Sequence, residues 1–345
     1  MRHTAARVTA LLTVSVALPG LAGCTASDTR VDVPEATASA PPAPTSTPSA
    51  DAALPRDCSI FPADNVWHAD ISALPTHASS AAWVESIGPD RPLHPDFGSG
   101  LWEGAPFGIP ITDVSPDQPA VTVSFEYAAE SDPGPYPIPA DVRIEGGPDA
   151  TGDRHVILLD AEACVAYELY AAWPQGDGTW RAGSGAVFDL RSNQLRPAGW
   201  TSADAAGLPI IAGLVRYEEV AAGHIDHAIR FTAPRTRNDY VWPARHAASR
   251  SSDPALPPMG ARFRLKASVD TSSFPPQARV IAEALKRHGM ILADNGSAWF
   301  LTGTQDERWD NDDLRALRSL TGRDFEAVDT SSLMVDPDSG RYRTG

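Results

Sequence analysis

Two carboxylates on predicted strands are the residues of this sequence best placed to do chemistry. Glu168 lies within the strand-like stretch CVAYELY, and Asp189 ends the stretch GAVFD. Hydrolysis of a glycosidic bond needs one protonated and one ionised carboxyl group on either side of the bond. We therefore expect Glu168 and Asp189 to form the catalytic pair of a glycoside hydrolase. The alternative partners of Glu168 are Asp226 and Glu145.

Several histidines and an arginine extend this inventory. In a hydrolase they would orient the substrate, whereas in a polysaccharide lyase a His or Tyr would remove a proton while cations neutralise the uronate carboxylate. The candidates for these roles are His155, Tyr167, His227, Arg230 and His246. A third hypothesis is a non-catalytic lipoprotein that binds a cell-envelope glycan or a partner. The sequence has no GxSxG, HExxH, GxxxxGK[ST] or strand-linked GxGxxG motif, so we expect neither a metal nor a cofactor.

Two polar, aromatic segments provide the predicted substrate contacts. Residues 183–213 and 240–246 combine Trp and Tyr rings with Asp and Arg, a mixture that suits stacking on sugar rings and hydrogen bonding to their hydroxyls. The strand-like stretch ARFRLKA adds a row of cations. The predicted binding residues are Trp200, Asp204, Tyr240, Trp242, Arg262 and Arg264. The alternatives are a loop buried against its own domain and a basic row that faces solvent.

The elements that must position these residues are mostly strands. Alternating apolar and polar residues predict strands at 121–127, 155–160, 164–170, 185–190, 227–233, 261–267, 290–293 and 298–301. Capping and breaking residues predict helices at 78–87, 277–288 and 312–320. Long proline-rich connections between strands favour an antiparallel β-sandwich or jelly roll with a few peripheral helices.

The stretches on either side of residues 161–163 form a predicted hairpin. A turn at these residues pairs Val156 with Glu168. In this register Glu168 and His155 lie on opposite faces of the hairpin, because successive side chains of a strand alternate. A slip of one residue would bring both to the same face.

The N-terminal region has the features of a secretion signal. Residues 1–23 contain two arginines followed by an apolar run that is short for a membrane span and that ends in LAGC. This ending resembles the lipobox of bacterial lipoproteins, in which the cysteine is acylated. The resemblance implies that Cys24 carries lipid and holds the protein on the extracytoplasmic face of the cell membrane. The alternative is an ordinary cleaved signal peptide.

Composition divides the remaining chain. Residues 24–55 are rich in Pro, Ala, Ser and Thr and predict a tether, because such a segment buries too little apolar surface to fold. Residues 56–330 then form a single β domain, and residues 331–345 form a polar tail. Once Cys24 is set aside, Cys58 and Cys164 remain as an even pair, which favours a disulfide outside the cytoplasm.

The charge of the chain restricts its partners. The 345 residues include 28 Lys+Arg against 44 Asp+Glu, a net charge of −16. Proteins that bind nucleic acid phosphates need a basic face, so we expect no nucleic acid partner. We expect a monomer that handles a polysaccharide, with a neutral glycan favoured over a polyanion.

Several stretches resemble a family of predicted secreted proteins and lipoproteins of actinobacteria. The resemblance implies one domain and a secreted location, and it implies no particular reaction. It covers most of residues 58–330, and the matching stretches are 132–147, 152–170, 183–213, 223–231, 240–246 and 258–294.

Overall fold

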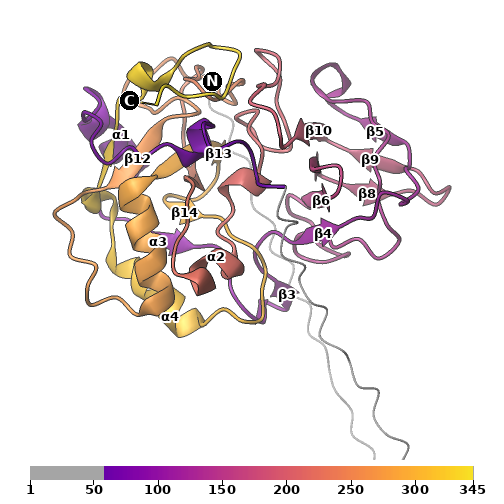
Figure 1. Ribbon diagram of the computed structural model, residues 1–345, viewed down its shortest axis with the longest axis horizontal. Coiled ribbons are helices and arrows are strands. Elements are labelled where there is room, and N and C mark those ends of the chain that lie inside the picture. Colours follow the sequence, from indigo (N-terminus) through magenta and orange to yellow (C-terminus); the bar gives the residue numbers. More distant parts are fainter. Residues whose placement is uncertain (1–57, 345) are drawn as a thin grey trace, which may run out of the picture. The chain divides into compact units, whose positions relative to one another are not determined.

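The computed structural model describes residues 58–344 (Figure 1). The predicted signal peptide, the lipid attachment at Cys24 and the tether lie outside these residues and stay predictions. Among the described residues, no helix is long and apolar enough to cross a membrane.

Strands predominate in this part of the chain, as expected, and helices are few. The strands are β1 (His94–Pro95), β2 (Leu101–Trp102), β3 (Ala105–Pro106), β4 (Ile111–Asp113), β5 (Val123–Phe125), β6 (Val156–Asp160), β7 (Val165–Tyr170), β8 (Trp173–Pro174), β9 (Trp180–Ala182), β10 (Ser184–Asp189), β11 (Ile229–Ala233), β12 (Arg262–Leu265), β13 (Met290–Asn295), β14 (Phe300–Leu301) and β15 (Phe325–Ala327). The α-helices are α1 (Ser80–Ile87), α2 (Tyr217–Ala222), α3 (Pro276–Arg287) and α4 (Asn311–Arg315). Short 3-10 helices lie at Val66–His68, Ala128–Glu130, Ile211–Gly213, Ala316–Ser319, Gly322–Asp324 and Ser331–Leu333.

A six-stranded sheet in the order β1-β14-β11-β13-β12-β15 carries most of the main core. Strand β11 lies inside this sheet, parallel to β13 and antiparallel to β14. Figure 1 shows α3 beside this sheet, and its buried Ile281 and Leu285 belong to the main core. The helix begins at Pro276, directly after the capping residue Pro275. Proline suits this first position because the backbone N–H that it lacks would have no partner within the helix. The sheet therefore holds β11 and β13 rigidly from both sides.

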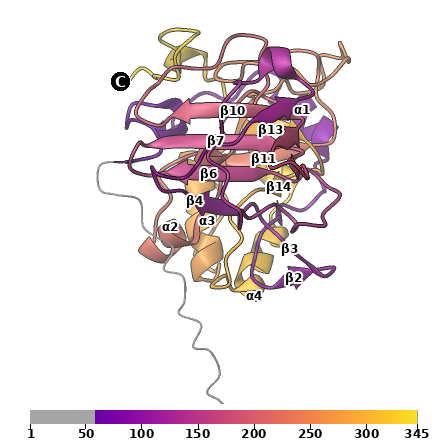
Figure 2. The same cartoon turned by 90° about the vertical axis from the view of Figure 1, so that its right-hand side faces the viewer.

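Figure 2 shows the four-stranded sheet in the order β10-β7-β6-β4, and its strand β6 is buried on both faces. Ile157 and Leu159 of β6 join the main core, whereas Val156 and Leu158 join a second core shared with the three-stranded sheet β5-β9-β8. This division follows from the alternation of side chains along a strand. The fully apolar start of β6 is therefore the signature of a strand between two cores.

The register of the β6–β7 hairpin differs by one residue from the prediction. Ile157, rather than Val156, lies opposite Glu168. The reason is the turn: Cys164 takes a left-handed conformation with φ of 59° and belongs to the turn instead of to β7. The predicted register is wrong, and Glu168 lies on the same face of the sheet as Ile157 and His155.

The sheets are mixed, so the expectation of purely antiparallel pairing is also wrong. The pairs β1–β14, β4–β6, β5–β9 and β11–β13 are parallel. Parallel pairing needs a long crossover, and the connection from β11 to its parallel partner β13, which contains β12 and α3, supplies one. The jelly roll stays a prediction.

The ends of the described chain are fastened to the domain. Cys58 and Cys164 form the predicted disulfide, with Cα atoms 5.4 Å apart and a sequence separation of 106. Residues 331–344, expected to be a polar tail, are instead part of the domain: Ser339 bridges to Gln194 and Arg341 bridges to Asn65. Backbone pairing, which polar composition does not reveal, explains this difference.

Candidate active site

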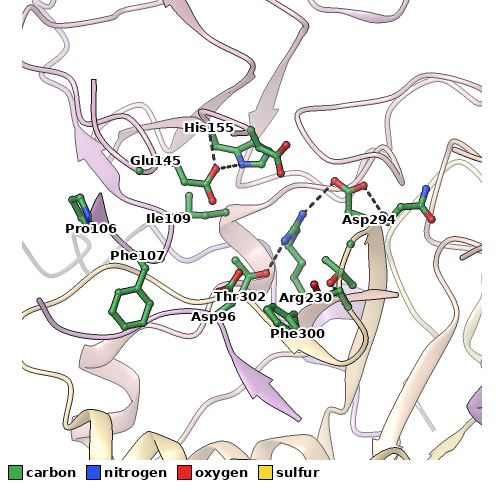
Figure 3. Close-up of a pocket in the computed structure, with 17 residues that line it drawn as sticks. Asp96, Pro106, Phe107, Ile109, Glu145, His155, Arg230, Asp294, Phe300 and Thr302 are labelled. Atoms are coloured by element: carbon green, nitrogen blue, oxygen red, sulfur yellow. Dashed lines mark hydrogen bonds and ion pairs between the residues drawn. The ribbon is translucent and has the colours of Figure 1, made fainter. Parts of the chain in front are cut away.

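A pocket of about 300 Å³ lies beside β11 and β13, and we call it the central pocket (Figure 3). Strand β11 supplies Arg230, β13 supplies Asp294, and the residue after β1 is Asp96. The segment before β6 supplies Glu145 and His155. Segments from both large sheets thus bring ionisable side chains to one place.

Glu145 and His155 form a close pair at the pocket wall. The His155 Nδ1 lies 2.6 Å from the Glu145 Oε2, and its Nε2 lies 3.2 Å from the carbonyl oxygen of Ala203. Because both ring nitrogens face acceptors, the imidazole is held with both protons. Burial disfavours either charge, but each partner's charge and the shared hydrogen bond outweigh it, raising the pKa of His155 and lowering that of Glu145. The pair is therefore an imidazolium and a carboxylate.

The backbone after Glu145 turns sharply. Gly146 and Gly147 have φ angles of 72° and 93°, which L side chains rarely adopt. The two glycines therefore let the chain turn directly after Glu145, whose carboxylate lies at the pocket in Figure 3.

The guanidinium of Arg230 is held by Asp204 and Thr302. Its Nε and Nη2 donate to the two carboxylate oxygens of Asp204 at 2.7 and 2.9 Å, and its Nη1 donates to the Thr302 hydroxyl at 2.6 Å. The side chain of Asp204 is fully buried. This two-pronged pair neutralises most of the guanidinium charge, so Arg230 works as a rigid floor of the pocket rather than as a free cation.

Asp294 is a pocket carboxyl group whose pKa is raised by its surroundings. Burial and the nearby charge of Asp204 raise its pKa to about 7, although Arg230 and His155 act in the opposite direction. Its Oδ2 lies 3.5 Å from the Arg230 Nη2, and about 24% of its side chain stays exposed. At neutral pH Asp294 is therefore protonated in about half of the molecules, in a position that a ligand can reach.

Asp96 is a third carboxyl group in the same pocket. The surrounding protein and the charge of Glu145 raise its pKa, against the effect of Arg230. The pocket thus contains one carboxyl group driven toward ionisation and two driven toward protonation. Separated proton affinities of this kind distinguish an acid from a base in a catalytic site.

Two further hollows adjoin the central pocket. The first, the hairpin pocket, measures about 700 Å³ and is lined by 102–106 of the β2–β3 hairpin and by 145–154. The second, the loop pocket, measures about 450 Å³ and is lined by Tyr127, His246 and residues around 201–205. Glu145 and Asp153 line both the central and hairpin pockets, and Asp153 and Asp294 line both the central and loop pockets. Asp153 lines all three hollows, so they adjoin one another, and together we call them the groove.

Three of the six predicted catalytic residues line this groove. His155 and Arg230 line the central pocket, and His246 lines the loop pocket, where its Nδ1 is 2.8 Å from the carbonyl oxygen of Ala205. The other three lie elsewhere: Glu168 and His227 are buried and Asp189 is exposed at the end of β10. The structure therefore does not bring Glu168 and Asp189 together, and their side chains point to opposite faces of the sheet.

Glu168 supports the chain under the groove. Its two carboxylate oxygens accept hydrogen bonds from the backbone N–H groups of Ile210 and Ile211 at 2.8 and 2.9 Å. Burial nevertheless raises its pKa to about 7. A carboxylate with both oxygens occupied by backbone donors anchors the 183–213 segment instead of meeting a substrate. His227 is similarly occupied, by Glu219 at 3.1 Å.

The residues predicted to contact substrate lie elsewhere in the structure. Arg262 is fully buried and donates to the carbonyl oxygens of Val66, Ala69 and His288, while Arg264 pairs with Glu326. Arg262 and Arg264 are therefore neither placed for substrate contact nor part of a fully solvated row, because their guanidinium groups bond to other parts of the chain. None of the predicted contact residues lines any of the three hollows: Trp200, Asp204, Tyr240, Trp242, Arg262 and Arg264.

Sequence reasoning missed Asp96 and Asp294 and treated Glu145 only as an alternative. Asp294 directly precedes Asn295-Gly296 at the end of a buried strand, and Asp96 follows the short strand β1. An acidic residue between an apolar run and a glycine-containing loop is the signal that could have found both, because functional side chains concentrate where strands give way to loops.

In comparisons with known proteins, no family model, no curated protein and no solved structure matched this chain. Within residues 58–344, no group of three or more His, Cys, Asp or Glu side chains is arranged to hold a metal ion.

Proposed function

We propose that this protein hydrolyses glycosidic bonds of a polysaccharide, with Asp294 as the general acid and Glu145 as the base or nucleophile. The observation that supports the proposal most is that one pocket holds two carboxyl groups with opposite pKa shifts: Asp294, which a ligand can reach and whose pKa is raised to about 7, and Glu145, whose pKa is lowered. Glycoside hydrolysis requires this division of protonation between two carboxyl groups.

The reaction assigns a task to each group. Asp294 donates its proton to the glycosidic oxygen as the bond from that oxygen to the anomeric carbon breaks. Glu145 either removes a proton from the attacking water or attacks the anomeric carbon itself, after which water releases the sugar. Arg230 and His155 hold the two carboxyl groups in place. The anomeric form of the first product, read by NMR, distinguishes the two routes.

The lyase alternative has weaker support. A uronate lyase needs a neutral base and a free cation. His155 is held with two protons by Glu145 and a carbonyl oxygen, and Arg230 is already paired with Asp204. Neither side chain offers what β-elimination requires.

The proposed location is the extracytoplasmic face of the cell membrane, through lipid on Cys24. The LAGC sequence supports this location, and the Cys58–Cys164 disulfide suits an oxidising compartment. Non-catalytic binding of an envelope glycan through the same groove is the alternative.

A panel of neutral and acidic polysaccharides tests the proposed reaction. The purified protein should release new reducing ends from at least one polymer, and no absorbance from an unsaturated uronate should appear. Release of unsaturated product indicates elimination instead, and no product from any polymer leaves only the binding function.

A further inference from the structure

We propose that the groove binds an internal stretch of an uncharged polysaccharide, with Trp102 and Tyr127 stacking on sugar rings at its two ends. This inference rests on the proposed function, since it defines the substrate class of the same site. It follows from the position of exposed aromatic rings and from the charge of the groove.

Exposed aromatic side chains mark both ends of the groove. Among residues 58–344, Trp102 and Tyr127 are the two aromatic residues with exposed side chains, at 67% and 48%. Trp102 lines the hairpin pocket and Tyr127 lines the loop pocket, and each of these hollows adjoins the central pocket. A large exposed ring exposes apolar surface to water, and aromatic faces suit the apolar CH faces of sugars.

The length of the groove favours a polymer over a small sugar. The hairpin and loop pockets share walls with the central pocket but contain neither Asp96 nor Arg230. In the proposed binding mode the chain runs from Trp102 to Tyr127 across the central pocket, so that sugar units lie on both sides of its carboxyl groups. Such a chain is cut internally rather than shortened from one end.

The walls of the groove carry mostly negative charge. Seven carboxyl residues line the three hollows: Asp96, Glu103, Glu130, Glu145, Asp149, Asp153 and Asp294. The two arginines there are occupied, because Arg230 pairs with Asp204 and Arg154 donates to carbonyl oxygens while lying 3.6 Å from the Trp173 ring. The pKa values of Asp96 and Asp294 are raised, and Glu145 is paired with His155, so these three carboxyl groups contribute little net charge. The negative charge comes from the other four carboxylates, which would repel a polyanion, and we therefore expect the groove to disfavour polyuronates and sulfated glycans.

The buried Arg154 gives this wall its shape. Its guanidinium donates to the carbonyl oxygens of Ala172, Pro148 and Ala150 at 3.0, 2.8 and 2.9 Å. These bonds fasten the segment 148–150 of the hairpin pocket to the end of β7. The groove is therefore built before any ligand arrives.

Affinity electrophoresis of the purified full chain tests the inference. The gels contain hydroxyethyl cellulose, galactomannan, arabinogalactan or dextran as neutral probes and polygalacturonate as the anionic probe. We expect retention by at least one neutral polymer and none by polygalacturonate. Trp102→Ala and Tyr127→Ala should each weaken retention about tenfold, as loss of one aromatic stacking contact allows.

Leu101→Ala is the matched control, because Leu101 lies on the same hairpin with the same 67% exposure but does not line the hairpin pocket. It should be retained like the wild type. Retention by polygalacturonate, no retention by any neutral polymer, or unchanged retention of both aromatic variants overturns the inference.

Reducing-end release by the same samples separates the two proposals. Cleavage that proceeds equally in Trp102→Ala and the wild type refutes the stacking role and leaves hydrolysis intact. Retention that depends on Trp102 without any cleavage refutes hydrolysis and leaves the binding groove intact.

Discussion

Replacing Asp294 by Asn should stabilise the protein at alkaline pH while abolishing its activity. The carboxyl group has a pKa of about 7 in the folded protein against a usual value of 3.8. Between these values the folded chain keeps a proton that the unfolded chain releases, so stability falls as pH rises through this window. Each pKa unit corresponds to about 1.4 kcal/mol, and the full cost above pH 7 is therefore about 4 kcal/mol.

Asparagine has the shape of a protonated aspartic acid without the charge. At pH 8 the Asp294→Asn variant should exceed the wild type in free energy of unfolding by about 2–4 kcal/mol, whereas at pH 4 the two should agree closely. Glu168 also has a raised pKa, but it is present in both proteins and its contribution cancels.

Urea denaturation at the two pH values measures this difference. Asp189→Asn is the control, because Asp189 is exposed and lies outside the groove, and the Asn oxygen can still accept the hydrogen bond from the Arg191 backbone N–H. The reasoning is refuted if Asp294→Asn gains no stability at pH 8, or if its gain is the same at pH 4 or in the control variant.

Three other changes test the scaffold. Serine in place of both Cys58 and Cys164 should lower the free energy of unfolding by about 4 kcal/mol, since the bond closes a long loop, and denaturation under non-reducing conditions measures it. Arg230→Met should lower the free energy of unfolding by about 3–5 kcal/mol in the same assay, because Asp204 is left buried without its partner. A denaturation midpoint equal to that of the wild type contradicts the pairing. Arg262→Met should lower the melting temperature yet leave kcat/KM of the folded fraction unchanged, because its bonds go to backbone carbonyls outside the groove; a changed kcat/KM would restore its predicted substrate role.

The sequence predicts those features that depend on local residues, such as the positions of single strands. Unbroken apolar stretches located β6 and β13, and the even cysteine pair located the disulfide. The hairpin faces were not predictable from alternation alone, because the left-handed Cys164 lengthens the turn by one residue. That single residue decides which face Glu168 occupies, and thus whether it can meet a substrate.

The site was harder to predict because distant segments build it. Arg230 was chosen for its charge, but only the fold shows that Asp204 uses that charge below the pocket. Arg262 looked like part of a solvated row because nothing local reveals that the segment near Val66 lies across it. Asp96 and Asp294 are nearly two hundred residues apart in sequence, and the six-stranded sheet brings their strands together.

Rates of reducing-end release by the wild type, Glu145→Gln, Asp294→Asn and Asp189→Asn test the proposed hydrolysis most directly. On the polymer that the wild type cleaves, we expect Asp189→Asn to match it and the two pocket variants to be at least about a hundredfold slower, since each loses its acid or base. Equal rates for Glu145→Gln or Asp294→Asn and the wild type, or a loss of activity confined to Asp189→Asn, would contradict the assignment of the central pocket as the catalytic site.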